Sequence, residues 1–336
     1  MRAASRWTSE GTWRVRAFCL AFVILAYGSA IKGQQLPDSS FHFANAHPAF
    51  AAGAGPAVCV DAAHNNFHTL EDRYYAFGRL IRADGFRSIS LTERLHQGVP
   101  AHCAVFVIAN ALPARAGDPG ADLNAPAFSP HEVRRILEWV VGGGRLLLIM
   151  DHSPYPAAVA DLAAVLGVLP LNGGAKYRMF GELPDASVRN IVEQHGVTAD
   201  SVRAFVGPLG TLGDHSILQG RPDMDLPVRS VMTFGGSTFY PAGDMRPLLQ
   251  VPAHARGTGR LPGPFQEHAP RYSLDGWLVG GAREVGPGRV VILGEAAMCS
   301  AQLAGPSRTP MGMNDPLATD NAQFCLNIVR WLAGVF

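Results

Sequence analysis

Residues 145–152 read Arg-Leu-Leu-Leu-Ile-Met-Asp-His, an apolar run that ends in a carboxylate and an imidazole. Residues 129–132 upstream, Ser-Pro-His-Glu, are a helix start with proline at the first helical position, and three glycines at 142–144 end that helix. A short run this apolar is typical of a strand buried on both faces. The order of helix, glycine stop, buried strand and polar loop predicts a parallel sheet in an α/β protein.

The same alternation extends in both directions from this strand. Further strands are predicted at 56–61, 86–91, 104–109 and 288–293, and helices at 69–83, 130–141, 156–166 and 321–332. We therefore predict a doubly wound, mostly parallel sheet within one α/β domain that spans residues 56–336. Residues 170–275 are rich in Gly and Pro and have short strand candidates at 229–234 and 248–251, which predicts a β-rich, loop-rich insertion.

The start of the chain has the pattern of a secretory signal peptide. Two arginines, Arg14 and Arg16, precede an apolar run at 17–27, and small residues follow up to Ala30. We expect a signal peptide over residues 1–30 and a Pro/Ala/Gly/Ser-rich linker over 31–55, in a periplasmic or extracellular protein. The alternative is an inner-membrane anchor formed by residues 17–31, although a spanning helix needs about 20 apolar residues.

Charge and motifs exclude several classes of function. The 306 residues after position 30 carry 24 basic and 26 acidic side chains, which does not fit a nucleic-acid-binding surface. No phosphate-binding GxxxxGK[ST] loop is present, and the glycines at 142–144 precede a strand instead of following one, so no nucleotide cofactor is expected. The GxSxG turn of serine hydrolases is absent as well.

Four cysteines follow the predicted signal peptide, and none has CxxC spacing. An oxidising compartment permits disulfides, but four cysteines allow three pairings and a domain of this length does not require any. We therefore interpret them as small buried hydrophobic side chains. They are Cys59, Cys103, Cys299 and Cys325.

Polar side chains cluster where the predicted strands end, and the carboxyl ends of parallel strands meet at one edge of a sheet. As acid, base or ligand groups we select Asp61, His64, Asp151, His152 and Glu295. As binding residues we select Asn65, Asn66, Asn110, His215, Gln302, Asn314, Asp320 and Asn321. We expect all of them to share one rim, whereas the nearby His68 is interpreted as a helix cap or a surface residue.

Each candidate also has a structural interpretation. Asp61 and Asp151 can cap the helices that follow them, and Asp320 is a good N-cap for the last helix. A divalent metal held by His64, His152 and Glu295 is a further hypothesis, because imidazole and carboxylate suit Zn or Mn. No HExxH or HxH pair supports it, so the cofactor stays open.

Several of these segments resemble a known bacterial family. The resemblance rests on the polar loop at 61–66, the block at 138–152, the Gly-Asp-His stretch at 213–221 and the ending from Gly294 to Leu332. The family is the domain of unknown function numbered four-three-five-zero, in the class I glutamine amidotransferase-like superfamily, which includes trehalose-utilisation-like proteins and auxiliary domains of gliding and ABC-transport systems. The resemblance implies a flavodoxin-like sheet. It does not imply glutaminase activity, because Asp151 and His152 stand where the nucleophilic cysteine would be.

Two functions are compatible with these observations. The first is an exported hydrolase-like enzyme, metal-assisted or not, that uses the His/Asp/Glu cluster on a small molecule. The second is a non-catalytic binding module of the cell envelope that holds a sugar, a peptide or a protein on the same rim. Either would meet a membrane only through an uncleaved signal segment.

Overall fold

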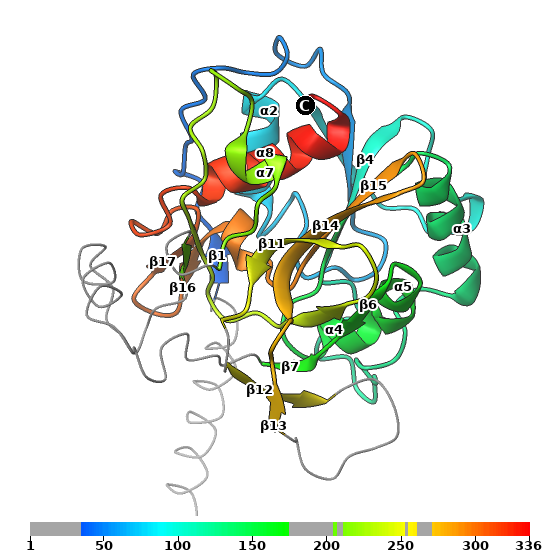
Figure 1. Cartoon of the computed structure of the whole chain (residues 1–336). Helices are drawn as coiled ribbons and strands as arrows, with labels where there is room; N and C mark the ends of the chain where they lie inside the picture. The colour runs from blue at the N-terminus through cyan, green and yellow to red at the C-terminus, as the bar shows by residue number, and fades with distance from the viewer. Residues whose placement is uncertain (1–34, 175–203, 207–210, 253–254, 261–270) are drawn as a thin grey trace, which may run out of the picture.

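The computed structural model describes residues 35–174, 204–206, 211–252, 255–260 and 271–336 (Figure 1). Its centre is a nine-stranded sheet. Five neighbouring strands are parallel, in the order β3 (Arg87–Leu91), β2 (Ala57–Asp61), β4 (Cys103–Ala109), β5 (Arg145–Ile149) and β15 (Gly288–Leu293). Antiparallel strands complete it, namely β14 (Leu278–Val285), β10 (Phe239–Pro241), β6 (Val168–Pro170) and β11 (Arg246–Gln250), which pairs with β14. The predicted doubly wound, flavodoxin-like α/β architecture is confirmed.

Helices cover both faces of the sheet. One face carries α2 (Tyr75–Ala83), α7 (Ser216–Gln219) and α8 (Asn321–Ala333), and the other carries α3 (Pro130–Val141), α4 (Tyr155–Ala158) and α5 (Ala160–Val165). Successive strand residues point to opposite faces, so Leu147 and Ile149 lie on the face that carries α8, while Leu146 and Leu148 lie on the face that carries α3, α4 and α5. The inner parallel strands β2, β4, β5 and β15 are buried on both faces and are therefore mostly apolar, and each fully buried large apolar side chain contributes roughly 1.5–3 kcal/mol to the free energy of folding.

Most predicted elements form, with shifted ends. The α3 helix begins as expected: the Ser129 side chain accepts from the Glu132 backbone N–H, and the Glu132 side chain accepts from the Ser129 backbone N–H. The helix predicted at 156–166 is divided into α4 and α5 by Val159, whose backbone (φ −114°, ψ 13°) leaves the helical region. The long strand β14 was not predicted, because two adjacent glycines interrupt its apolar pattern.

Three small sheets lie beside the main one. The first contains β1 (Gln35–Pro37), β16 (Ala301–Ala304) and β17 (Thr309–Gly312). The second contains β7 (Asn172–Gly174), β12 (Arg256–Arg260) and β13 (Arg271–Ser273). The third contains β8 (Ala204–Val206) and β9 (Ser230–Met232). Short 3₁₀ helices are η1 (Leu95–Gln97) and η3 (Ala297–Cys299). Many of these strands fall in the predicted insertion at 170–275, whose parts at 175–203, 207–210, 253–254 and 261–270 lie outside the described residues.

Residues 35–55 belong to the fold, although their composition predicts a linker. The β1 strand pairs with β16, the Phe50 ring packs edge-on against Phe86 at 5.0 Å, and the His47 carbonyl accepts from Arg330. The predicted signal peptide lies outside the described residues. Within the part that is described, no helix is long and apolar enough to cross a bilayer.

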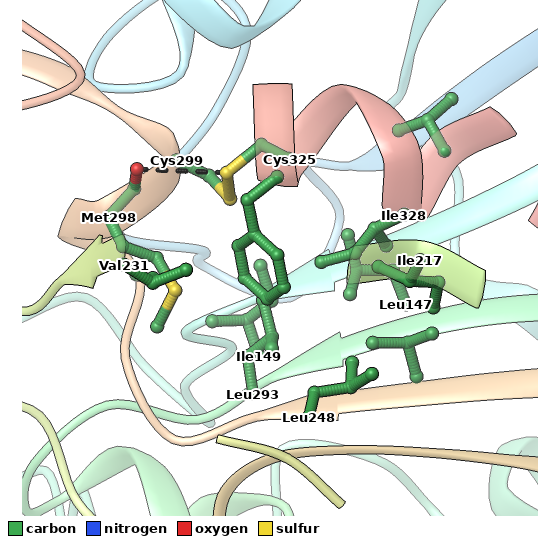
Figure 2. Close-up of a cluster of buried hydrophobic side chains, with 14 of the residues drawn as sticks. Leu147, Ile149, Ile217, Val231, Leu248, Leu293, Met298, Cys299, Cys325 and Ile328 are labelled. Atoms are coloured by element: carbon green, nitrogen blue, oxygen red, sulfur yellow. Dashed lines mark hydrogen bonds between the residues drawn. A yellow bond between two sulfur atoms is a disulfide. The ribbon is translucent and has the colours of Figure 1, made fainter. Parts of the chain in front are cut away.

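Two disulfides replace the free buried cysteines that the sequence analysis expected. Cys59 is bonded to Cys103, and Cys299 to Cys325, with Cα atoms 5.5 and 5.7 Å apart. Figure 2 shows the second bond joining the η3 turn to α8 above the core side chains of β5 and β15. The cysteines are buried as predicted, but the sequence could not show that each partner lies within bonding distance.

Candidate functional site

A cavity of about 640 Å³ opens where β5 and β15 end. Three residues of the predicted catalytic set line it, namely Asp151, His152 and Glu295, together with Gln302 of the predicted binding set. Its other walls are Gln35, Leu36, Phe67, His68, Asp72, Arg73, Tyr155, Phe234, Gly235, Ala297 and Met311. This part of the predicted shared rim therefore exists.

Strand register brings two buried carboxyl groups of the cavity together. Ile149 of β5 pairs with Leu293 of β15, and both strands run in the same direction. Asp151 and Glu295 each stand two residues beyond that pair, so adjacent strands present them at the same level. The Met150 backbone N–H donates to the Leu293 carbonyl at 3.0 Å and extends the pairing past the strand ends.

Glu295 is buried and retains its proton at a pH where an ordinary glutamate is ionised. Burial and the neighbouring Asp151 raise its pKa well above the ordinary glutamate value of 4.5, despite hydrogen bonds from backbone N–H groups. One of those bonds runs from the Ala297 N–H to Oε1 at 3.0 Å. The second oxygen, Oε2, is buried and has no hydrogen-bond partner among the described residues.

Asp151 is the second member of the pair, and its surroundings stabilise a negative charge better than those of Glu295. Burial raises its pKa, while the charge of His152 and hydrogen bonds from His152, Ala296 and Asn110 oppose the rise. The His152 N–H, for example, donates to Oδ1 at 2.8 Å. Because the two carboxyl groups interact, they titrate as a pair, and Asp151 is the better site for the negative charge.

His68 is a site residue that the sequence analysis missed. It was expected to be a cap or a surface residue, but only 2% of it is exposed and it lines the cavity. Burial and the charges of Arg73 and His152 lower its pKa to about 3, so the imidazole is neutral at physiological pH. Its Nδ1 accepts from Asn110 at 3.2 Å, and Nε2 has no partner among the described residues.

Gln302 contributes an acceptor to the same cavity. Its Nε2 donates to the Ser300 hydroxyl at 2.6 Å, and that hydroxyl donates to the Ala297 carbonyl at 2.9 Å. The Oε1 atom is buried and, within the described part of the chain, unpaired. A buried polar atom without a partner costs about 1–3 kcal/mol, so the unpaired atoms of His68, Glu295 and Gln302 indicate a site prepared for a ligand.

Aromatic and charged residues also line the cavity. The Arg73 guanidinium lies 3.7 Å from the centre of the Phe67 ring and pairs with Asp72 at 2.5 Å. His152 is exposed, and its Nδ1–H donates to the Ser153 carbonyl at 2.9 Å.

The Tyr74 hydroxyl donates to the Ala296 carbonyl at 3.1 Å and so ties the start of α2 to the loop that carries Glu295.

Asp61 and His64 lie elsewhere, and the expectation that both Asp–His pairs share one rim is wrong. The His64 Nδ1 lies 3.0 and 2.9 Å from the two Asp61 carboxylate oxygens, and Nε2 lies 3.2 Å from Glu132 Oε1. His64 is fully buried, with its ring 4.0 Å from that of Phe128. With both nitrogens engaged, His64 has no free atom for a substrate or a metal.

The remaining predicted binding residues serve the fold. Asn65 donates to the Leu112 carbonyl and Asn66 to the Ala109 carbonyl, so both fix the loop after β2. His215 caps α7 by accepting from the Ile217 N–H, and its ring packs against Trp331. Asn110 is different, because it connects Asp151 and His68 behind the cavity wall.

The last three predicted binding residues tie loops together. Asn314 donates to the Asp38 carboxylate at 3.0 Å. Asp320 makes no side-chain cap for α8; it accepts from the N–H groups of Arg229 and Ser230 instead. Asn321 pairs with both the N–H and the carbonyl of Met232. Sequence alone could not separate these roles from ligand binding, because amides and carboxylates suit both.

The predicted metal ligands do not form one set. His64 is removed from the cavity by its own ion pairs, while His152 and Glu295 line it. Among the described residues, one group of three ligand-type side chains has atoms within 4.8 Å of one another, namely Cys59, His102 and Cys103. Two of its members are joined in a disulfide and offer no thiolate.

Comparisons with known proteins address the fold. No family model and no curated protein match the chain. Among solved structures, the mmIFT52 N-terminal domain aligns with a TM-score of 0.52 at 11% identity, over 82% of this chain and 97% of that domain. A protein of Parabacteroides merdae described as ThuA-like aligns with a TM-score of 0.40 at 12% identity, over 83% of this chain and 89% of its own.

A second protein described as ThuA-like, from Bacteroides uniformis, aligns with a TM-score of 0.37 at 10% identity, over 88% of this chain and 95% of its own. At these identities the likeness concerns the fold alone. The flavodoxin-like architecture of this chain follows from its own sheet order and from the helices on both faces. Membership in the family of unknown function stays a prediction.

Proposed function

We propose that the chain is an exported acid–base enzyme of the hydrolase class and that its active site is the cavity beside Asp151 and Glu295. One observation carries the proposal: the buried Glu295 carboxyl group, whose Oε2 has no partner among the described residues, interacts with a second carboxyl group at the wall of an open cavity. Titratable groups whose environments separate their pKa values are typical of acid–base catalysis.

The two carboxyl groups have complementary roles in this proposal. Glu295, with its raised pKa, is the general acid that protonates the leaving group. Asp151, whose charge is supported by His152 and backbone N–H groups, is the general base that takes a proton from water. No step requires a metal, and His152 and Glu295 are the residues of the original metal hypothesis that could still contact one in the cavity.

Export is supported by the cysteine chemistry. Disulfides persist in oxidising compartments and are rare in the cytosol of most organisms. All four cysteines of the described residues are paired, which fits the predicted signal peptide and a periplasmic or extracellular location. The pairing also leaves no thiol nucleophile in the described part of the chain, so the proposal does not include glutaminase chemistry.

The alternative is a binding module for a sugar, a peptide or another small ligand. It uses the same unpaired atoms of His68, Glu295 and Gln302 to hold the ligand without turnover. The two functions differ in what a proton-transfer variant does. An isosteric carboxyl-to-amide change strongly lowers the rate of catalysis, whereas a binding site loses only part of its affinity.

The test is hydrolysis of chromogenic esters, anilides and glycosides by the mature protein and three variants. Glu295→Gln and Asp151→Asn should each lower the rate by roughly 10²- to 10⁴-fold, the usual contribution of a general acid or base. Glu284→Gln is the matched control, because the Glu284 side chain is 67% exposed and pairs with Arg289 at the end of β15 opposite to the cavity. Rates that stay within twofold in both cavity variants would exclude the acid–base role of these two residues, whereas no turnover by the unaltered protein would favour the binding module.

A further inference from the structure

The orientation of the Asn110 amide is determined by its partners. The Asp151 backbone N–H lies 2.9 Å from one atom of the amide, and a backbone N–H can only donate, so that atom is the oxygen. The other atom, 3.2 Å from His68 Nδ1, is therefore the NH₂ group, which can only donate. Asn110 holds this position in a left-handed backbone conformation (φ 52°), which is uncommon outside glycine.

This orientation decides the tautomer of His68. Because Asn110 donates to Nδ1, that nitrogen carries no proton, and the neutral ring must carry its proton on Nε2. The imidazole is 2% exposed, and Nε2 is buried without a partner among the described residues while the ring lines the cavity. Within the described part of the chain, His68 is thus a buried N–H donor without an acceptor, which is the arrangement expected of a group that binds a substrate oxygen.

We infer that His68 is a further catalytic residue whose Nε2–H binds the carbonyl oxygen of an acyl substrate, an ester or an amide, and that Asn110 is the positioning residue that fixes this tautomer. The inference rests on the proposed function and narrows its substrate class. A neutral imidazole can polarise a carbonyl without giving up its proton, as preorganised donors do at oxyanion sites.

The reaction balances with the groups in the cavity. Water attacks the carbonyl carbon and gives a proton to Asp151, while the carbonyl oxygen gains negative charge against the His68 Nε2–H. The carbon–oxygen or carbon–nitrogen bond to the leaving group then breaks, and Glu295 supplies the proton that the leaving alcohol or amine requires. The products are a carboxylic acid and an alcohol or amine. The proton held by Asp151 then restores Glu295.

The tautomer can be tested without a substrate, by ¹⁵N NMR of the full chain with labelled histidine. The chain has 12 histidines, so the His68 signals are identified by their loss in His68→Gln. We expect a protonated Nε2 and an unprotonated Nδ1 with no titration between pH 5 and 8. A His68 that is protonated on Nδ1, or that titrates in this range, overturns the inference.

Asn110→Gly tests the positioning role. Glycine adopts the left-handed backbone without strain, so the variant removes only the amide, and both His68 tautomers should then appear. Asn65→Gly is the matched control, because Asn65 also has a left-handed backbone (φ 47°) but bonds the Leu112 carbonyl. A His68 spectrum that is unchanged in Asn110→Gly, or changed equally in Asn65→Gly, overturns the role assigned to Asn110.

Kinetics with p-nitrophenyl acetate and p-nitrophenyl β-glucoside test the substrate class. We expect turnover of the ester, and a fall of about 10²- to 10³-fold in kcat with little change in KM for His68→Leu, the usual loss on removing one oxyanion donor. A smaller loss in His68→Gln, whose amide can still donate, would separate this role from a packing defect. Activity on the glycoside alone, or a fully active His68→Leu beside an inactive Glu295→Gln, overturns this inference and leaves the proposed function standing. No turnover of either probe overturns both.

Discussion

Gly236 lies against Glu295 so closely that a side chain at position 236 has no room. A Cβ atom built there would stand 2.4 Å from the Cβ of Glu295 and 2.3 Å from the Gly294 carbonyl oxygen. The Ser237 N–H also donates to that carbonyl at 2.6 Å. The glycine-rich loop at 234–237 therefore packs directly on the backbone that carries the proposed general acid, and it fixes where that acid stands.

Gly236→Ala should accordingly displace Glu295 and destabilise the fold. Overpacking of a tight contact costs about 1–3 kcal/mol, and here the contacted atoms are backbone and Cβ atoms, which cannot rotate away. The measurement is urea unfolding, followed by the ester assay on the folded variant. Gly142→Ala is the control, because its Cβ would come no closer than 3.2 Å to another atom and its backbone is ordinary (φ −77°). Equal stability of the two variants would contradict the close packing.

The protonated state of Glu295 predicts how stability depends on pH. A carboxyl group whose pKa is raised on folding holds a proton that the unfolded chain releases, so stability falls as the pH rises above the unfolded value of about 4.5. Glu295→Gln cannot titrate and lacks this loss. Relative to wild type, the variant should therefore gain stability between pH 4.5 and pH 8, as measured by urea unfolding at both pH values. A difference between the two proteins that is independent of pH would show that Glu295 has an ordinary pKa.

The parallel half of the fold could be predicted because burial on two faces leaves a strong local pattern. The apolar runs that end at Ile149 and Leu293, and the capping box at Ser129, are determined by nearby residues. The antiparallel strand β14 and the packing of residues 35–55 depend on contacts with distant parts of the chain, which leave little local signal.

The candidate site was predictable where strand ends determine it and not where loop direction determines it. Register on adjacent strands joins Asp151 to Glu295, and the rule that strand ends meet at one edge anticipates this. The rule does not show to which side of the sheet a loop turns. For that reason His64, and not His68, was expected in the cavity. The signal that could have separated them is Glu132, since an acidic residue at the third position of α3 offers a partner to His64.

The cluster of His64, Asp61 and Glu132 should prove to be structural. Removing the His64 imidazole leaves the two buried carboxylates without their shared partner. Breaking a buried ion pair in this way lowers the free energy of unfolding by roughly 3–5 kcal/mol. Chemical unfolding of His64→Ala should show such a loss. His96→Ala, at an exposed position in η1, should change the free energy of unfolding by no more than about 0.5 kcal/mol. A loss below 1 kcal/mol in His64→Ala would mean that the cluster adds little to stability.

The disulfides predict a thiol count. Of the five cysteines in the sequence, four are paired, which leaves Cys19 in the segment predicted to be cleaved. Unfolded protein titrated with a thiol reagent in the absence of reductant should thus show one thiol in the full-length chain and none in a chain that begins at Ile31. Prior reduction should raise the counts to five and four. Two or more thiols in the unreduced mature protein would contradict the pairing.

Arg330 should be the costliest single charge to remove. It is fully buried, donates to Asp84 at 2.8 and 2.5 Å, and reaches Asp225 at 2.9 Å and the His47 carbonyl at 3.1 Å. In Arg330→Met the methionine fills most of the volume but leaves Asp84 charged and buried, which should cost about 3–5 kcal/mol in urea unfolding.

A double variant separates charge from packing at this site. Adding Asp84→Asn to Arg330→Met removes the stranded charge, so the double variant should be more stable than Arg330→Met alone, although each change by itself destabilises. Arg135→Met is the control, because its ion pair with Glu138 is 43% and 53% exposed and should contribute less than about 1 kcal/mol. If instead the stability losses of the two single variants simply add in the double variant, the destabilisation comes from lost packing around α8. The buried ion pair is then not what joins that helix to the end of α2.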